Sequence, residues 1–384
     1  MIDTPHLVDQ YCHGVLRTEL GLGTFEAHLG AHLGGHPGGA AVLPAAGTTL
    51  FDTQTGFAVR RWCPPLLGLE PHCPPARYLA RRRELGAAEA GRRLLRASGI
   101  STYLVDTGLP GDLTRPAELG AAGAAEAHEI VRLEPLAERV ADTSGTVEAF
   151  LAHLAEAVHG AAAGAVAFSS ASGVRGGLAA LPEPPGPGEV RGAAGRWLAQ
   201  RAAGGPVTDP VLLRHLLWIA VTAGRPLQLH TEDPAALHGF AAATAGLGAD
   251  LVLLHRYPHH RAAAHLTGLH PHVYADLGPV LAHTGARAAA VLAEVLERAP
   301  FGKLLFSSGA QGLPELHVVA ASTFRSALGR VLGEWVMDGA WSRTDAQRVA
   351  TMIAADNAKR VYRLAGATGT SDGFGKPRHR EPTL

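Results

Sequence analysis

Three histidines each stand at the end of a short apolar run: His13 closes "LVDQYCH", His230 closes "RPLQLH" and His255 closes "LVLLH". If the runs are parallel strands of a barrel, their carboxyl ends meet at one rim, so the three imidazoles are expected to converge there. Three histidines with an open fourth position can hold one divalent metal ion, zinc or manganese, that activates water. The alternative is that the three rings pack or hydrogen-bond without a metal.

The runs that carry these histidines belong to a series of eight, separated by alanine- and leucine-rich helical stretches. Most steps from one run to the next have the length of one βα unit, and alternation of this kind is typical of a parallel sheet. We therefore predict an α/β fold, a (β/α)8 TIM-like barrel, with strands over 7–13, 101–106, 129–134, 164–169, 225–230, 251–255, 272–276 and 303–308.

Two gaps interrupt this rhythm and indicate insertions. Residues 14–100 are too many for one loop and one helix, and we interpret about 22–75 as an inserted N-terminal lid or cap over the barrel mouth. Prolines and glycines in "LPEPPGPGEVRGAAG" (181–195) favour a mobile loop over a regular helix. We expect the barrel domain to span 1–364, followed by a disordered tail over 365–384.

Composition excludes several classes of partner. The 34 basic and 34 acidic residues balance, so no overall field attracts nucleic acid or an anionic membrane. Neither a membrane-spanning run nor a signal-peptide pattern is found, so we expect a cytoplasmic protein with a small-molecule substrate or ligand; a homodimer stays open. Cys12, Cys63 and Cys73 lack the spacing of a zinc ribbon or a disulfide framework and are expected to be buried thiols.

Several longer segments, in one order, carry a resemblance to a known family: "VDQYCHGV", "FDTQTGFAVRRWCPP", "LLHRYPHHRAAAHL" and "MIAADNAKRVYRL". Over about residues 5–364 the chain resembles the amidohydrolase superfamily, and in particular barrels akin to the amidohydrolase half of glutamine-synthetase-fused fungal and plant proteins. The resemblance implies a metal-dependent hydrolase. Its ligands would be an HxH pair on the first strand, a lysine or carboxylate in mid-barrel, histidines on the fifth and sixth strands and an aspartate on the eighth.

The chain departs from that pattern at three ligand positions. Tyr11 stands in place of the first histidine, Ser169 in place of the lysine, and Gly309 in "SSGAQG" in place of the aspartate. Tyr11 could still coordinate as a phenolate and Ser169 could bind a water, but glycine offers only backbone. We therefore predict that the usual two-metal centre cannot assemble and that His13, His230 and His255 hold one metal ion or none.

Five residues are candidates for catalysis or substrate binding. Glu232 directly follows the fifth-strand histidine and Asp233 follows it in turn; we name Glu232 as a replacement general base and Tyr11 as a second catalytic residue. Arg175, in "GVRGG", could clamp a substrate carboxylate, with Ser169 beside it in substrate binding.

Other polar residues of the same region have simpler interpretations. Asp233 precedes Pro234 and fits a helix N-cap, and Asp276 at the end of the seventh run could orient a rim histidine. Many histidines crowd the stretch after His255, and we interpret most of them as solvated loop residues: His259, His260, His265, His270, His272 and His283.

The pattern as a whole favours a diverged amidohydrolase-like enzyme that acts on a small polar amide or related C–N compound, with at most one metal. One alternative is a pseudoenzyme that binds a ligand or a partner protein. Another is a metal-free lyase or transferase that uses Tyr11, His13 and Glu232.

Overall fold

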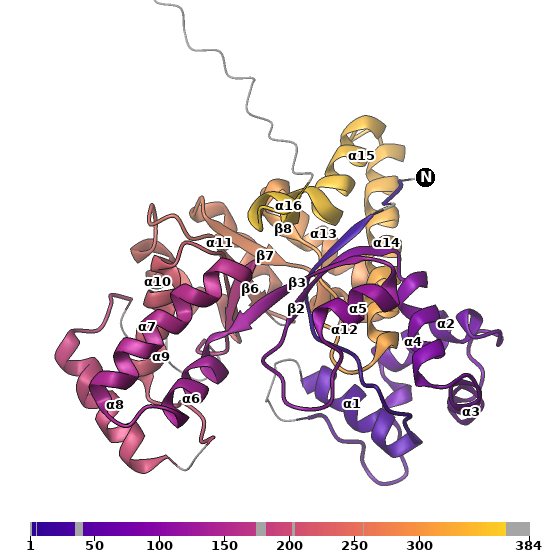
Figure 1. The fold of residues 1–384 in the computed structure, drawn as a ribbon. Coiled ribbons are helices and arrows are strands. Elements are labelled where there is room, and N and C mark those ends of the chain that lie inside the picture. The colour runs from indigo at the N-terminus through magenta and orange to yellow at the C-terminus, as the bar shows by residue number, and fades with distance from the viewer. Residues whose placement is uncertain are drawn as a thin grey trace, which may run out of the picture.

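The structure is a computed structural model, and it describes residues 2–4, 6–34, 41–173, 182–201, 204–255 and 257–365. Eight strands lie in one sheet in the order of the chain, each parallel to the next (Figure 1). They are β1 Leu7–Cys12, β2 Ile100–Asp106, β3 Glu126–Arg132, β4 Ala167–Ser170, β5 Leu227–Thr231, β6 Leu251–His255, β7 Val273–Asp276 and β8 Leu304–Leu305.

Backbone hydrogen bonds between β1 and the segment after β8 bring the two ends of the sheet together. Gln10 N donates to Phe306 O at 3.1 Å, Gly309 N to Tyr11 O at 3.0 Å and His13 N to Ala310 O at 2.8 Å. The predicted (β/α)8 barrel is thereby confirmed.

Most strand residues are buried because both faces of the sheet are covered, although β3 begins with exposed and half-buried polar residues. Inward residues such as Val8, Leu104 and Ile130 fill the barrel, whereas Leu7 and Val105 pack outward against helices. A parallel sheet buried on both sides reads as continuous apolar runs. For this reason the eight strands were recognisable, although β3 ends at Arg132, earlier than the predicted boundary at Glu134.

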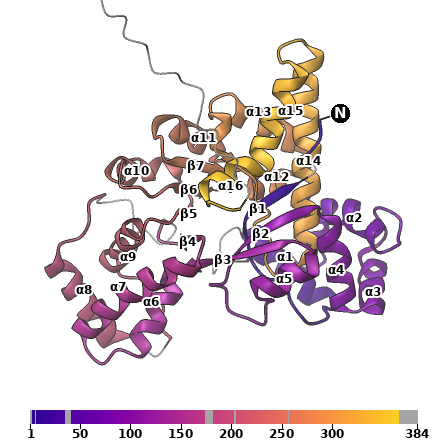
Figure 2. The ribbon, with the colours of Figure 1, turned by 45° about the horizontal axis from the view of Figure 1, so that its top comes forward.

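Helices surround the sheet. In both views α6–α9 lie on one side of the barrel, and α1–α4 lie with α14 on the other (Figures 1 and 2). No helix within the described ranges has both the length and the apolar character needed to cross a membrane. The α-helices are α1 Leu22–Gly34, α2 Gln54–Leu66, α3 Pro75–Leu85, α4 Ala87–Ala97, α5 Pro116–Gly123, α6 Leu133–Asp142, α7 Val147–Gly164, α8 Pro187–Gln200, α9 Pro210–Thr222, α10 His238–Ala243, α11 His260–Leu269, α12 Gly278–Thr284, α13 Ala288–Leu296, α14 Pro314–Met337, α15 Arg343–Thr351 and α16 Asn357–Val361.

Short helical segments complete the fold. They are the 3-10 turns η1 Leu50–Asp52, η2 Pro234–Leu237, η3 Gly285–Arg287 and η4 Phe301–Lys303, and the π-helical segment η5 Met352–Asp356. The predicted cap is confirmed at η2, where Asp233 Oδ1 accepts a hydrogen bond from Ala235 N at 3.0 Å.

The predicted loop over 181–195 is wrong for most of its length, because α8 begins at Pro187. Proline is tolerated in the first turn of a helix, where its missing N–H has no intrahelical partner in any case. Burial of Val190, Ala193 and Trp197 then stabilises the helix against the cost of its glycines.

Helices α1–α4 all lie in the gap between β1 and β2. The interpretation of 22–75 as a lid stays a prediction, as do the domain limits. Residues 366–384, which make up nearly all of the expected tail, lie outside the described residues.

The turn after β8 requires glycine at position 309. Gly309 has a φ of 56°, in the left-handed region, and a Cβ added there would lie 2.7 Å from Pro279 Cγ. An aspartate at this position would therefore meet both backbone strain and a steric clash. The missing acid is thus part of the local backbone geometry, and Pro279 takes up the space that a side chain at position 309 would need.

We expect Gly309→Ala to lower the free energy of unfolding by at least about 1 to 2 kcal/mol, because the alanine pays for a left-handed backbone and displaces Pro279. Gly160→Ala is the matched control, since Gly160 lies exposed in α7 with open space around its Cα, and it should raise stability by up to about 1 kcal/mol. Urea unfolding of both variants measures the difference; equal stability of Gly309→Ala and the wild type would contradict this account.

Candidate functional site

The three predicted histidines line one cavity at the carboxyl ends of the strands. His13 follows β1, His230 lies in β5 and His255 ends β6, and each side chain is almost fully buried. The cavity has a volume of about 30 Å³. A space of this size holds about one or two small species such as a water or an ion.

Burial keeps two of these imidazoles, His13 and His255, neutral. It lowers the pKa of His13 to about 4 and the pKa of His255 to about 4. A neutral imidazole can offer a ring nitrogen to a metal ion without first losing a proton.

The tautomer of His13 follows from its two hydrogen bonds. Its Nδ1 lies 2.8 Å from the carbonyl oxygen of Asp106, which can only accept, so Nδ1 carries the proton. Nε2 is then the acceptor and receives a hydrogen bond from the Tyr11 hydroxyl at 2.8 Å. His255 Nδ1 makes a longer 3.5 Å contact with the carbonyl oxygen of Leu253.

Tyr11 lies between two of the histidines. Its ring centroid is 5.1 Å from that of His13 and 5.1 Å from that of His230. Burial raises the pKa of the phenol well above its ordinary value. In this environment Tyr11 is a neutral hydrogen-bond donor, so the expected phenolate ligand is not what the structure favours.

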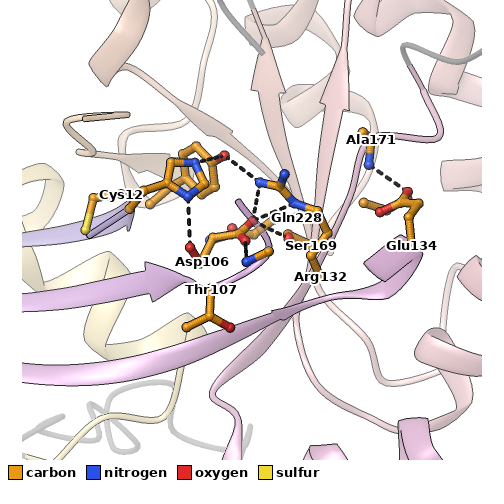
Figure 3. Close-up of polar contacts among 12 residues, drawn as sticks. Cys12, Asp106, Thr107, Arg132, Glu134, Ser169, Ala171 and Gln228 are labelled. Carbon is orange, nitrogen blue, oxygen red and sulfur yellow. Dashed lines mark hydrogen bonds and ion pairs between the residues drawn. The ribbon is translucent and has the colours of Figure 1, made fainter. Parts of the chain in front are cut away.

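A buried ion pair between Arg132 and Asp106 helps to hold Tyr11 in place. Arg132, the last residue of β3, donates to Asp106 Oδ2 from Nη2 at 2.7 Å and from Nε at 3.1 Å, and its Nη2 also donates to Tyr11 Oη at 3.3 Å (Figure 3). Ser169 Oγ donates to the same carboxylate oxygen at 2.5 Å. Burial alone would raise the pKa of Asp106, but the charge of Arg132 and these hydrogen bonds lower it to about 2.

Arg132 is the main residue that sequence reasoning missed. We had placed Glu134 at the end of the third strand, but Glu134 lies in the first turn of α6 and accepts hydrogen bonds from Ser170 Oγ at 2.6 Å and Ala171 N at 2.9 Å (Figure 3). An arginine inside the apolar run "EIVRLE" was the available signal, since a charge within a buried strand requires a buried partner.

Other predicted residues do not come to the cavity. Ser169 is fully buried but bonded to Asp106, and Glu232 is exposed; neither lines the cavity. Arg175 lies outside the described residues. Asp276 accepts a hydrogen bond from Ser307 Oγ at 2.9 Å, and no hydrogen bond given for it in the described structure comes from a histidine.

Two histidines that we had not assigned to the site also line the cavity. His32 comes from α1 and is 3% exposed, and its ring packs edge-to-face on that of His283 with centroids 5.0 Å apart. His283, from α12, is half-buried, so its interpretation as a solvated loop residue is wrong. The insertion has no sequence period from which the placement of His32 could be predicted.

A second group with metal-ligand chemistry lies between β1 and α14. One ligand atom each from Asp9, Cys12 and His317 lies within 4.8 Å of the others, and all three residues are buried. Asp9 already accepts hydrogen bonds from Ser308 N at 2.7 Å, Ser308 Oγ at 2.5 Å and His317 Nδ1 at 3.2 Å. Burial raises the pKa of the Cys12 thiol well above its ordinary value. We interpret this group as a polar link that fixes the turn after β8.

Comparison with solved structures shows which proteins share this barrel. A metal-dependent hydrolase from Lactobacillus casei superposes with a TM-score of 0.77 at 21% identity, over 94% of this chain and 96% of that one. The uronate isomerase of Thermotoga maritima superposes with a TM-score of 0.59 at 12% identity, over 93% and 94%. These likenesses show a shared barrel fold. Glucuronate isomerase of Caulobacter crescentus shares the barrel as well, with a TM-score of 0.57 at 13% identity over 94% and 91%.

Sequence comparison adds one curated relative. Protein FluG of Emericella nidulans is 35% identical over 153 residues, which is 36% of this chain and 18% of FluG, so the match spans less than a fifth of that protein. No family model matches the chain. These likenesses agree with the amidohydrolase resemblance expected from the sequence motifs.

We expect Arg132→Met to lower the free energy of unfolding by about 3 to 5 kcal/mol, because it leaves the Asp106 carboxylate buried without a cation. Arg93→Met, which breaks an exposed pair with Glu89 in α4, should cost no more than about 1 kcal/mol. Urea unfolding compares the two. The double variant Arg132→Met/Asp106→Asn should recover part of the loss, and a single-variant cost no larger than the control would contradict the buried-pair account.

Asp276 gives a pH-dependent expectation. Burial raises its pKa to about 7, so the folded protein holds this proton more tightly than the unfolded chain does. The protonated Asp276 carboxyl therefore stabilises the folded protein at low pH. This stabilisation is lost as the pH rises towards about 7, and the free energy of unfolding falls by up to about 1.4 kcal/mol per pH unit. Asp276→Asn should flatten the stability profile between about pH 4 and about pH 7; an unchanged slope in urea unfolding would show that the carboxyl ionises normally.

Proposed function

We propose that this amidohydrolase-fold protein is a hydrolase that acts on a small polar amide or related C–N compound, with a single divalent metal ion, zinc or manganese, in the histidine cavity. The observation that carries the proposal is the convergence of His13, His230 and His255 on that one cavity. Three imidazoles with an open position are a known ligand set for a catalytic metal.

The donor set has the chemistry to bind one ion, but the ring nitrogens of His13, His230 and His255 do not all lie within 4.8 Å of one another in the described structure, so the rings must shift to share it. His255 Nε2 is buried and has no hydrogen-bond partner among the described residues, and His13 Nδ1 is held by a backbone carbonyl, as it is in many metal-ligating histidines. His13, His230 and His255 would hold the ion. When bound, it would polarise a substrate carbonyl and lower the pKa of a bound water.

The donor set does not favour a second ion. Ser169, which stands where the family has a bridging lysine, gives its hydroxyl proton to Asp106, and Gly309 has no side chain to offer.

The chain's own residues have separate roles in this proposal. Tyr11 holds a proton at Oη, directed at His13 Nε2, and Arg132 fixes the orientation of the phenol. Binding of an ion by His13 requires this hydrogen bond to open, which leaves the Tyr11 hydroxyl as a proton donor at the cavity. No carboxylate is found among the described residues that line the cavity, so an imidazole is the available proton acceptor.

The Tyr11–His13 hydrogen bond also supports a second candidate, a metal-free lyase or transferase. A neutral phenol 2.8 Å from an imidazole nitrogen is a ready proton-transfer pair, and it occupies the nitrogen that a metal would need. Glu232, the third residue of that hypothesis, is exposed and adds nothing to the pair.

The test combines elemental analysis with activity on a panel of amides and γ-glutamyl compounds, using protein purified with excess zinc or manganese. We expect about one metal equivalent per chain and hydrolysis that a chelator abolishes and added metal restores. His255→Ala should lose metal and activity by more than the ~10- to 100-fold typical of losing a second-shell partner. His265→Ala, at an exposed histidine of α11, is the matched control and should retain both.

Other outcomes select the alternatives. Chelator-resistant turnover that is lost in Tyr11→Phe would favour the metal-free enzyme. Ligand binding without metal and without turnover would favour a pseudoenzyme. Two tightly held equivalents would contradict the single-ion site.

A further inference from the structure

His32 lines the histidine cavity and has a buried nitrogen without a hydrogen-bond partner among the described residues. It lies on α1, in the insertion between β1 and β2, and its side chain is 3% exposed. Its Nε2 has no hydrogen-bond partner among the described residues, whereas the backbone carbonyl of Gly309 accepts a hydrogen bond from the ring. Since Nε2 is without a partner, the donor is Nδ1. A buried polar atom left unpaired costs about 1 to 3 kcal/mol, so its retention points to a ligand.

Two other rings of the cavity show the same arrangement. His13 directs Nδ1 at the carbonyl oxygen of Asp106, and His255 directs Nδ1 at that of Leu253. Histidines that bind metal through Nε2 are commonly held in this way, with the other nitrogen on a backbone carbonyl. His32 therefore matches the expected ligands in both tautomer and placement, although it comes from a different part of the chain.

The position of His32 also relates it to the missing acid. The turn at Gly309 has no room for a side chain beside Pro279, but its carbonyl oxygen is the group that orients His32. His283 packs edge-to-face against the other side of the ring, at 5.0 Å between centroids and 77° between planes. Gly309 therefore lacks the side-chain ligand of the family pattern, but its backbone carbonyl oxygen holds the His32 imidazole in place.

We propose, on the basis of the single-metal function above, that His32 is a fourth protein ligand, which replaces the aspartate of the family pattern and brings helix α1 to the metal. Two consequences follow. The ion has an imidazole where the pattern has a carboxylate, so the site carries one negative charge fewer. Metal binding also ties α1 to the barrel, because a ligand on α1 and the ligands on β1, β5 and β6 share one ion.

The experiment titrates metal-free protein with Co²⁺ and follows the visible absorption bands of the bound ion. We expect His32→Gln to weaken Co²⁺ binding by at least about 10-fold and to change the spectrum, because one nitrogen ligand is lost. His28→Gln is the matched control, since His28 lies one turn earlier on α1 and does not line the cavity; it should leave affinity and spectrum unchanged. Circular dichroism checks that each variant is folded.

A second measurement uses the wild-type protein alone. Hydrogen exchange of peptides from α1 should slow when Co²⁺ is added, whereas exchange in α8, on the opposite side of the barrel, should not change. If His32→Gln does not fold, His32→Ala with added imidazole replaces it, and restoration of the wild-type spectrum by imidazole is the expected result.

The outcomes separate this inference from the proposed function. If the wild type binds one Co²⁺ and His32→Gln binds it with the same affinity and spectrum, His32 is not a ligand and the three-histidine site stands. Unchanged exchange in α1 on metal binding would likewise overturn the role of His32 alone. A wild type that binds no Co²⁺ overturns both.

Discussion

The ion pair between Arg132 and Asp106 is the interaction on which the arrangement of the rim depends. Removing two charges from water costs several kcal/mol per ion, and only close, multiple hydrogen bonds offset it. Asp106 receives such bonds from Arg132, from Ser169 Oγ at 2.5 Å and from Gly108 N at 2.8 Å. Because these residues end β2, β3 and β4 or follow directly, the pair fixes three strand ends at once.

The same pair determines the chemistry available at the cavity. Arg132 donates to Tyr11, and Tyr11 donates to His13, whose other nitrogen returns to the Asp106 carbonyl. This closed chain sets the tautomer of His13 and keeps the phenol protonated.

The relatives in fold include a hydrolase and two sugar-acid isomerases, so the barrel alone does not choose a reaction. The features that distinguish this chain lie in the loops at the barrel rim. Gly309 occupies a left-handed turn that leaves no side-chain space beside Pro279, and the insertion between β1 and β2 places His32 against that turn. A barrel rim can change its ligands in this way because the loops after the strands vary without disturbing the core.

The sequence by itself determined the barrel and three of its rim histidines, because strands buried on both faces must be apolar and a polar residue at their end marks the rim. It could not place Arg132, since a charge beside a strand boundary usually belongs to a helix or to the surface, and only the partner Asp106, 26 residues away, makes burial tolerable. It also mistook the start of α8 for a loop, because the packing of Trp197 is invisible in local propensity. Tertiary structure alone decided that His32 is buried at the cavity and that Glu232 is exposed. Contacts between distant segments determine which loop side chains point inward, and these contacts leave no periodic pattern in the sequence.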